Sequence, residues 1–194
     1  DARLVSLNAR DAAERGAIVL TRARVTAAER AGDHWRITVI QDHDLRTFRA
    51  KVLVNAGGPW VEQVVRGIAR IDTKESIRLV RGSHILVPRL HGGDQALTLQ
   101  GEDGRVVFVI PYQQHWSLVG TTEVEVDAPL APDAWHPTVA EARYLRDVVR
   151  RLLPSHADVP AIAVTSGLRP LLAAPQGGVG SAPREHRVVE DGAL

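Results

Sequence analysis

The segment from Val52 to Trp60 constrains the fold of this chain more than any other. An apolar run, Val52-Leu53-Val54, is followed by Asn55-Ala56-Gly57-Gly58 and then by Pro59. This order predicts a buried strand that ends in a tight turn, and the missing Cβ atoms of the glycines would let a ligand approach the backbone. Pro59 suits the first position of a helix, where its missing N–H is not needed. Because ligands in open α/β sheets lie beyond the carboxyl ends of strands, the segment is either a cofactor contact or an ordinary strand-to-helix turn.

The composition is that of a globular protein, and it argues against several classes of function. The 194 residues are 44% hydrophobic and 24% charged, which fits one large domain or two small ones. The formal net charge is +1 without a long basic run, so no nucleic-acid partner is predicted. Disulfides, thiolate metal sites and a cysteine nucleophile are excluded because there is no cysteine. None of the eight histidines pairs with another at metal-ligand spacing, so no metal site is predicted. No apolar run approaches the ~18 residues of a membrane-spanning helix.

The pattern of residues 1–71 predicts part of a nucleotide-binding α/β domain. We expect a helix over residues 2–15, capped by Gly16. The other elements expected here are strands over 17–25, 35–39 and 46–54, a turn over 30–33, and a helix after Pro59 with Val61, Val64, Val65 and Ile68 on one side. No G-x-G-x-x-G sequence follows an opening strand, so the usual pyrophosphate-binding turn is missing. The chain therefore reads as a piece of a longer protein.

The pattern after residue 72 predicts a mainly antiparallel sheet with one long helix. Short extended runs separated by polar or glycine turns are expected over 77–80, 84–87, 96–99, 106–110 and 116–119, with a hairpin at 111–115. Thr138 and Glu141 fit a capping box at the start of a helix that Pro154 ends. A last strand is expected over 161–168, and a loop over 173–181. The predicted fold class is mixed α/β, or α+β.

From Val54 to Val61 the chain resembles the FAD-dependent (aerobic) glycerol-3-phosphate dehydrogenases, which belong with D-amino acid oxidase and glycine oxidase to one group of flavoproteins. Further similar stretches follow in the family's order at 1–5 with Asn8-Ala9, 20–24, 77–85, 107–111, 119–123 and 166–171. The resemblance implies a partial, Rossmann-like FAD-binding domain over 1–71. It implies a substrate domain over 72–165 and a return segment with substrate-binding arginines over 166–194.

The resemblance also implies an activity and its partners. The family oxidises sn-glycerol 3-phosphate to dihydroxyacetone phosphate, passes a hydride from C2 to flavin N5, and then passes electrons to quinone. It implies FAD as cofactor and a cytoplasmic location, with the intact protein peripheral on the inner face of the cell membrane. Because the pyrophosphate turn and the family's C-terminal domain are missing, we expect the isolated chain to be inactive or nearly so.

Three side chains are expected at the substrate. Arg169 lies between an apolar run and Pro170, where a guanidinium can hold a phosphate through two hydrogen bonds, and the family's arginine at this place grips the substrate. Arg184 matches a second phosphate-site arginine, although its neighbours differ from the family pattern. His84 lies near the flavin in the family and has a side chain suited to proton transfer near neutral pH.

The expected cofactor contacts come from three stretches. The resemblance places the backbone of Val25 at the adenine and the turn from Asn55 through Ala56 and Gly57 to Gly58 along the flavin. Thr121 and Thr122 follow Gly120 and would face the isoalloxazine edge. The plain alternative for each is an ordinary sheet or turn residue.

Two other functions stay open. One is a related FAD-dependent oxidase acting on an amino acid, and the other is a non-redox domain that binds a phosphate ligand and holds no flavin. The pair Arg169 and Arg184 favours a phosphate over an amino acid, because two guanidiniums match a dianion better than a single carboxylate.

Overall fold

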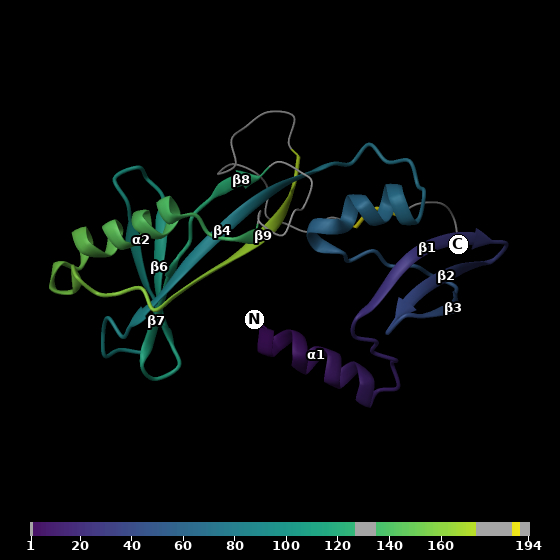
Figure 1. Ribbon diagram of the computed structural model, residues 1–194, viewed down its shortest axis with the longest axis horizontal. Helices are drawn as coiled ribbons and strands as arrows, with labels where there is room; N and C mark the ends of the chain where they lie inside the picture. The colour runs from purple at the N-terminus through teal and green to yellow at the C-terminus, as the bar shows by residue number, and fades with distance from the viewer. Residues whose placement is uncertain (1, 127–134, 174–187, 191–194) are drawn as a thin grey trace. The chain divides into compact units, whose positions relative to one another are not determined.

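The computed structural model describes residues 2–126, 135–173 and 188–190 (Figure 1). It confirms the mixed α/β class. The chain divides into two compact units, one of Asp1–Thr73 with Val189–Leu194 and the other of Lys74–Val188. No helix among the described residues is long and apolar enough to cross a membrane.

The first unit combines one helix with a three-stranded antiparallel sheet. Helix α1 (Ala2–Glu14) ends near Gly16, whose φ of +96° fits the predicted cap. The strands, in the order β1-β2-β3, are β1 (Ala23–Ala31), β2 (His34–Gln41) and β3 (Asp44–Ala50). Ala28, Trp35 and Val39 are buried in this sheet.

The first strand begins and ends later than the sequence predicts. We expected it over 17–25 with a turn over 30–33, whereas β1 runs from Ala23 to Ala31. The tight turn at Gly32, with a φ of +68°, brings Ala31 opposite His34 and so sets the register of the hairpin. Pairing with β2 therefore decides the bounds of the strand.

The apolar run before the glycine turn is not a strand. Val52 and Val54 are 53% and 79% exposed, and no described segment pairs with them. A strand needs partners for its backbone N–H and C=O groups, so an apolar run alone does not form one. The helix expected after Pro59 is present in irregular form, as a 3₁₀ turn, η1 (Gly58–Trp60), and a π-helical segment, η2 (Gln63–Ile68).

The second unit is built on a six-stranded antiparallel sheet. Its strands are β4 (Ile77–Pro88), β5 (Leu97–Gln100), β6 (Val106–Tyr112), β7 (Trp116–Gly120), β8 (Val124–Val126) and β9 (Ala163–Leu172). The hydrogen-bonded order is β5-β6-β7-β4-β8. Strands β7 and β8 pair with different parts of one edge of β4, and β9 pairs with its other edge. The two runs expected at 77–80 and 84–87 form one strand, because Arg81-Gly82-Ser83 also pairs with β9. The predicted hairpin between β6 and β7 is confirmed.

Helix α2 (Val139–Leu152) covers one face of this sheet (Figure 1). Its predicted capping box is confirmed, and Pro154 follows in a short 3₁₀ turn, η4 (Pro154–His156). The core lies between helix and sheet and contains Ile85, Val87, Leu90, Val107, Val109, Val119, Leu145, Val148 and Val149. On β6 the residues that alternate with this core, from Val106 to Tyr112, are exposed. We call this second side of the sheet the open face.

Candidate active site

Three of the predicted site residues, His84, Arg169 and Thr121, belong to one region of the second unit. The register places Gly120 of β7 directly between Phe108 of β6 and His84 of β4. Residues that pair directly point to the same side of a sheet, so these three positions share the open face. Phe108 is 42% exposed and adds apolar surface beside the imidazole.

His84 lies over Gly120, which has no side chain to obstruct it. A Cβ atom at Gly120 would overlap the imidazole ring. Burial, and then the positive charge of Arg169, lower the pKa of His84 below its usual 6.5. The neutral imidazole is therefore favoured at neutral pH, and this is the form that can accept a proton.

Arg169 crosses β4 to reach the same place. It stands in β9 opposite Val80, and its guanidinium lies where a Cβ atom of Gly82 would be. Its Nη2 donates to Oγ1 of Thr121 at 2.9 Å. The Thr121 hydroxyl in turn donates to the carbonyl of Thr122 at 3.1 Å. The guanidinium of Arg169 is thus held at the end of β7, next to Gly120.

The other predicted site residues, apart from Thr122, lie in the first unit or outside the described residues. Arg184 lies outside the described residues. Val25 and the turn of residues 55–58 belong to the first unit. There Val25 lies inside β1 and pairs with Val39 of β2. Asn55 uses its side chain to hold its own turn: Nδ2 donates to the Val61 carbonyl at 2.9 Å, and Oδ1 accepts from the Gly57 N–H at 3.1 Å. The side chain of Asn55 is therefore occupied within its own turn.

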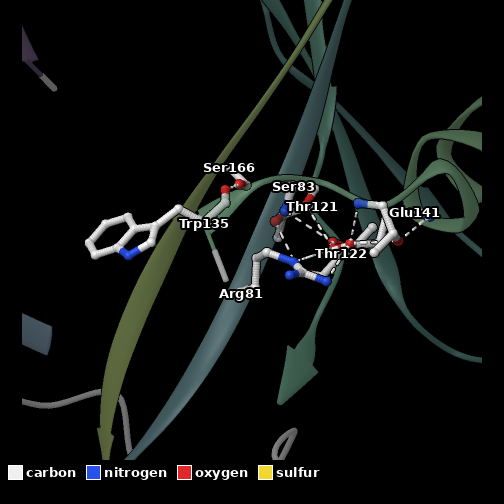
Figure 2. Close-up of polar contacts among 8 residues, drawn as sticks. Arg81, Ser83, Thr121, Thr122, Trp135, Glu141 and Ser166 are labelled. Atoms are coloured by element: carbon white, nitrogen blue, oxygen red, sulfur yellow. Dashed lines mark hydrogen bonds and ion pairs between the residues drawn. The ribbon is translucent and has the colours of Figure 1, made fainter. Parts of the chain in front are cut away.

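Thr122 points to the helix side of the sheet, unlike its neighbour Thr121. Its side chain is 1% exposed, and its hydroxyl donates to Oε1 of Glu141 at 2.8 Å. This hydroxyl is therefore buried and bound to Glu141, and it does not face the open side of the sheet. Thr122 belongs instead to a polar cluster with the buried residues Arg81, Ser83 and Glu141 (Figure 2). The exposed Thr138 also bonds to Glu141, and we call these five residues the Glu141 cluster.

The Glu141 cluster gathers donors around one carboxylate. Arg81 Nη2 donates to Oε2 at 2.9 Å, and Ser83 Oγ donates to Oε1 at 2.7 Å. Thr138 completes the capping box through its backbone N–H at 2.8 Å. Burial alone would raise the pKa of Glu141, but hydrogen bonds from Thr138, Ser83 and Arg81 outweigh it and lower that pKa to about 2. The carboxylate is therefore ionised throughout the neutral range.

In the sequence, Glu141 is recognisable only as part of a helix cap, and no motif gives Arg81 or Ser83 a role. The available signal was an arginine and a serine inside a mainly apolar strand, which also contains Arg78 and His84. Glu141, the partner of Arg81 and Ser83, lies 60 and 58 residues away along the chain, so nothing local connects them.

The open face suits an anionic ligand that carries a planar ring. Exposed apolar side chains on β6 offer surface for a ring, and Arg169 offers charge to an anion. The side-chain-free positions Gly82 and Gly120 allow close approach. Among the described residues, no group of three or more acidic, histidine or cysteine side chains is placed to hold a metal ion.

Comparison with known proteins identifies the family. Residues 1–191 match the family described as FAD dependent oxidoreductase (DAO). A glycerol-3-phosphate dehydrogenase of Pseudomonas tolaasii is 42% identical over 173 residues, which are 88% of this chain and 33% of that protein. A D-erythritol 1-phosphate dehydrogenase of Brucella abortus is 36% identical in an alignment of 194 positions, which covers 96% of this chain and 37% of that protein.

A solved structure supports the same conclusion. The glycerol-3-phosphate dehydrogenase from Bacillus halodurans complexed with FAD superposes with a TM-score of 0.72 at 27% identity, over 84% of this chain and 34% of that one. The chain thus spans about a third of the length of these relatives. The resemblance found in the sequence motifs is confirmed, and this chain belongs to the FAD dependent oxidoreductase family.

Proposed function

We propose that the protein containing this chain is an FAD-dependent dehydrogenase that oxidises sn-glycerol 3-phosphate to dihydroxyacetone phosphate. The observation that carries the proposal is the cluster of Arg169, Thr121 and His84 on the open face. The names of the two relatives, both dehydrogenases of a polyol phosphate, support this substrate class. Quinone as electron acceptor and peripheral attachment to a membrane remain parts of the proposal that come from the family resemblance.

Arg169 is the proposed anchor for the phosphate. Its guanidinium carries a permanent charge and is held in place by the Thr121 hydroxyl. Arg184 is the proposed second cation of the same site. With its phosphate held by Arg169, the three-carbon substrate would place C2 over β4, the strand that carries His84.

His84 is the proposed acceptor of the C2 hydroxyl proton. Oxidation of a secondary alcohol removes a hydride from carbon and a proton from oxygen, and a neutral imidazole can take that proton. The flavin, when bound, supplies the two-electron acceptor for the hydride. The backbone of Val25, the turn from Asn55 to Gly58 and the backbone near Thr121 are the proposed contacts to this cofactor.

The test compares Arg169→Met with wild type in steady-state oxidation of sn-glycerol 3-phosphate with a dye as electron acceptor. We expect KM to rise about 10- to 100-fold, because the variant loses charged hydrogen bonds to the phosphate. Oxidation of glycerol, which has no phosphate, should be equally slow in both proteins. Arg78→Met is the matched control: Arg78 lies in the same sheet but is bound to Glu125 at 2.7 Å, so its loss should leave KM unchanged.

Two results would contradict the proposed function. One is an unchanged KM in Arg169→Met. The other is a wild-type enzyme that oxidises glycine or D-alanine in preference to any polyol phosphate, which would establish the amino acid oxidase instead. D-erythritol 1-phosphate belongs in the same assay, since one relative is named for it and a longer polyol would keep the same phosphate anchor.

A further inference from the structure

We propose that Glu141 is a positioning residue, which holds His84 and Thr121 in place from the opposite side of the sheet. This rests on the proposed function, because only there do His84 and the Arg169–Thr121 pair receive a role. Glu141 is 5% exposed and belongs to the helix side, so it does not touch the substrate itself.

The link is the alternation of side chains along an extended backbone. Ser83 directly precedes His84, and Thr122 directly follows Thr121. Ser83 and His84 are successive residues of β4, so their side chains point to opposite faces. Thr121 and Thr122 lie between β7 and β8, and their contacts show the same division: Thr121 bonds to Arg169 on the open face, and Thr122 bonds to Glu141 on the helix side. Side chains that fix Ser83 and Thr122 on the helix side therefore also fix the backbone from which His84 and Thr121 reach the open face.

The Glu141 cluster closes a gap in the sheet at this point. Pairing of β4 with β7 ends at His84 and Gly120, and pairing with β8 resumes only at Arg81 and Val124. Within the gap, the Thr122 N–H donates to the Ser83 carbonyl at 3.2 Å, and the Thr122 hydroxyl accepts from the Ser83 N–H at 3.0 Å. The same hydroxyl donates its only proton to Glu141, so its orientation is determined.

A carboxylate satisfies all of these partners at once. Both oxygens of Glu141 accept hydrogen bonds: Oε1 from Ser83 and Thr122, and Oε2 from Arg81 and Thr138. Glutamine has the same shape but keeps only one of the two accepting oxygens. An amide nitrogen on the Oε2 side would face the donors of Arg81 and Thr138, and on the Oε1 side it would take from the Ser83 and Thr122 hydroxyls the acceptor for their protons. Glu141→Gln should therefore loosen Ser83 and Thr122 without removing any bulk.

The first experiment is kinetic and uses the enzyme that contains this chain. In Glu141→Gln we expect kcat for sn-glycerol 3-phosphate to fall about 10- to 100-fold, because a small misplacement of reacting groups has that effect. Thr122→Val should lower kcat in the same way, and Thr122→Ser, which restores the hydroxyl, should recover it.

Val148→Ala is the control for destabilisation, because Val148 lies in the core on the same helix but outside the Glu141 cluster. It should lower the melting temperature and leave kcat and its pH profile unchanged.

The second experiment uses NMR of the His84 ring in the 194-residue chain and needs no enzyme activity. The ring signals and their titration midpoint should move in Glu141→Gln and Thr122→Val, and stay at the wild-type values in Thr122→Ser and Val148→Ala. If the wild-type enzyme oxidises no polyol phosphate, the proposed function fails, and this experiment still tests the coupling. Folded Glu141→Gln and Thr122→Val with wild-type His84 signals would overturn the inference. A loss of kcat in Val148→Ala as large as in Glu141→Gln would also overturn it.

Discussion

Two glycines decide where the side chains of Arg169 and His84 can lie. Gly82 leaves room for the guanidinium of Arg169, and Gly120 leaves room for the ring of His84. Both stand in strands, where glycine ordinarily weakens packing and often marks a place that another group must approach closely. Here the approaching groups are side chains of neighbouring strands, so the absence of a Cβ is part of the site's geometry.

Gly82→Ala should weaken phosphate binding without unfolding the protein. The added methyl group would overlap only the far end of the Arg169 side chain, which can swing away from Thr121. We expect KM for sn-glycerol 3-phosphate to rise about tenfold, which corresponds to about 1.4 kcal/mol. The melting temperature should stay at the wild-type value or rise slightly, since alanine restricts the unfolded chain more than glycine does.

Gly167→Ala provides a matched control for this prediction. Gly167 stands directly opposite Gly82 in β9, and a Cβ atom there would meet nothing within 4 Å. The control should leave KM unchanged. Equal rises in KM for both variants would show that the loss of a strand glycine matters, and not the displacement of Arg169.

At the scale of elements, the sequence predicts well those features, such as caps and hairpins, that depend on residues close together in the chain. The capping box at Thr138 and Glu141 and the hairpin between β6 and β7 are both as expected, because each depends on residues close together in the chain. The bounds of β1, the merged strand β4 and the unpaired run at 52–54 differ from expectation. Each of these depends on which segment supplies the pairing partner, and periodicity does not contain that information.

The same distinction applies to the candidate site. His84, Arg169 and Thr121 could be proposed from the sequence because they lie in short motifs that resemble a known family. The bond between Arg81 and Glu141 could not, because it joins a strand to a helix 60 residues later. The cap motif gave Glu141 a structural role but did not indicate the strand residues that it also holds.

The cap of α2 should contribute measurably to stability. The Thr138 hydroxyl accepts from the Glu141 N–H at 3.2 Å and donates to Oε2 of Glu141 at 2.8 Å. Thr138→Ala should lower the free energy of unfolding by about 1 to 2 kcal/mol, the usual loss for a helix cap. Thr138→Ser keeps the hydroxyl and should lose much less, as measured by urea unfolding. Equal stability of the alanine variant and the wild type would contradict the assigned cap.

At the scale of the whole molecule, the two units have different cores. In the described part of the first unit, the buried apolar residues are Ala28, Trp35 and Val39. The second unit has a continuous apolar core between its sheet and α2. Its buried Arg81–Glu141 pair lies between the same helix and sheet. The stability of this unit therefore depends on pH as well as on apolar packing, because the Glu141 carboxylate, whose pKa is lowered in the folded protein, stabilises the fold only while it is ionised.

Acid should destabilise the second unit in a defined range of pH. The pKa of Glu141 is about 2 in the folded protein, against 4.5 for an unperturbed glutamate. Because the folded pKa is the lower one, the unfolded state takes up a proton first as the pH falls. The contribution is complete above pH 4.5 and is lost progressively as the pH falls towards 2, with an upper limit of about 3 kcal/mol.

The measurement is urea unfolding between pH 7 and pH 2, followed by a signal from the second unit. Glu141→Gln should be less stable than wild type at pH 7, and the difference should shrink as the pH falls below 4.5. The lowered pKa of His84 also reduces stability as the pH falls below 6.5 in both proteins, so the range below pH 4.5 is the one that reports on Glu141. Glu125→Gln removes an exposed carboxylate bound to Arg78 and should change the curve much less, because exposed ion pairs contribute little. A constant difference between wild type and Glu141→Gln down to pH 2 would mean that Glu141 is not held ionised by its partners.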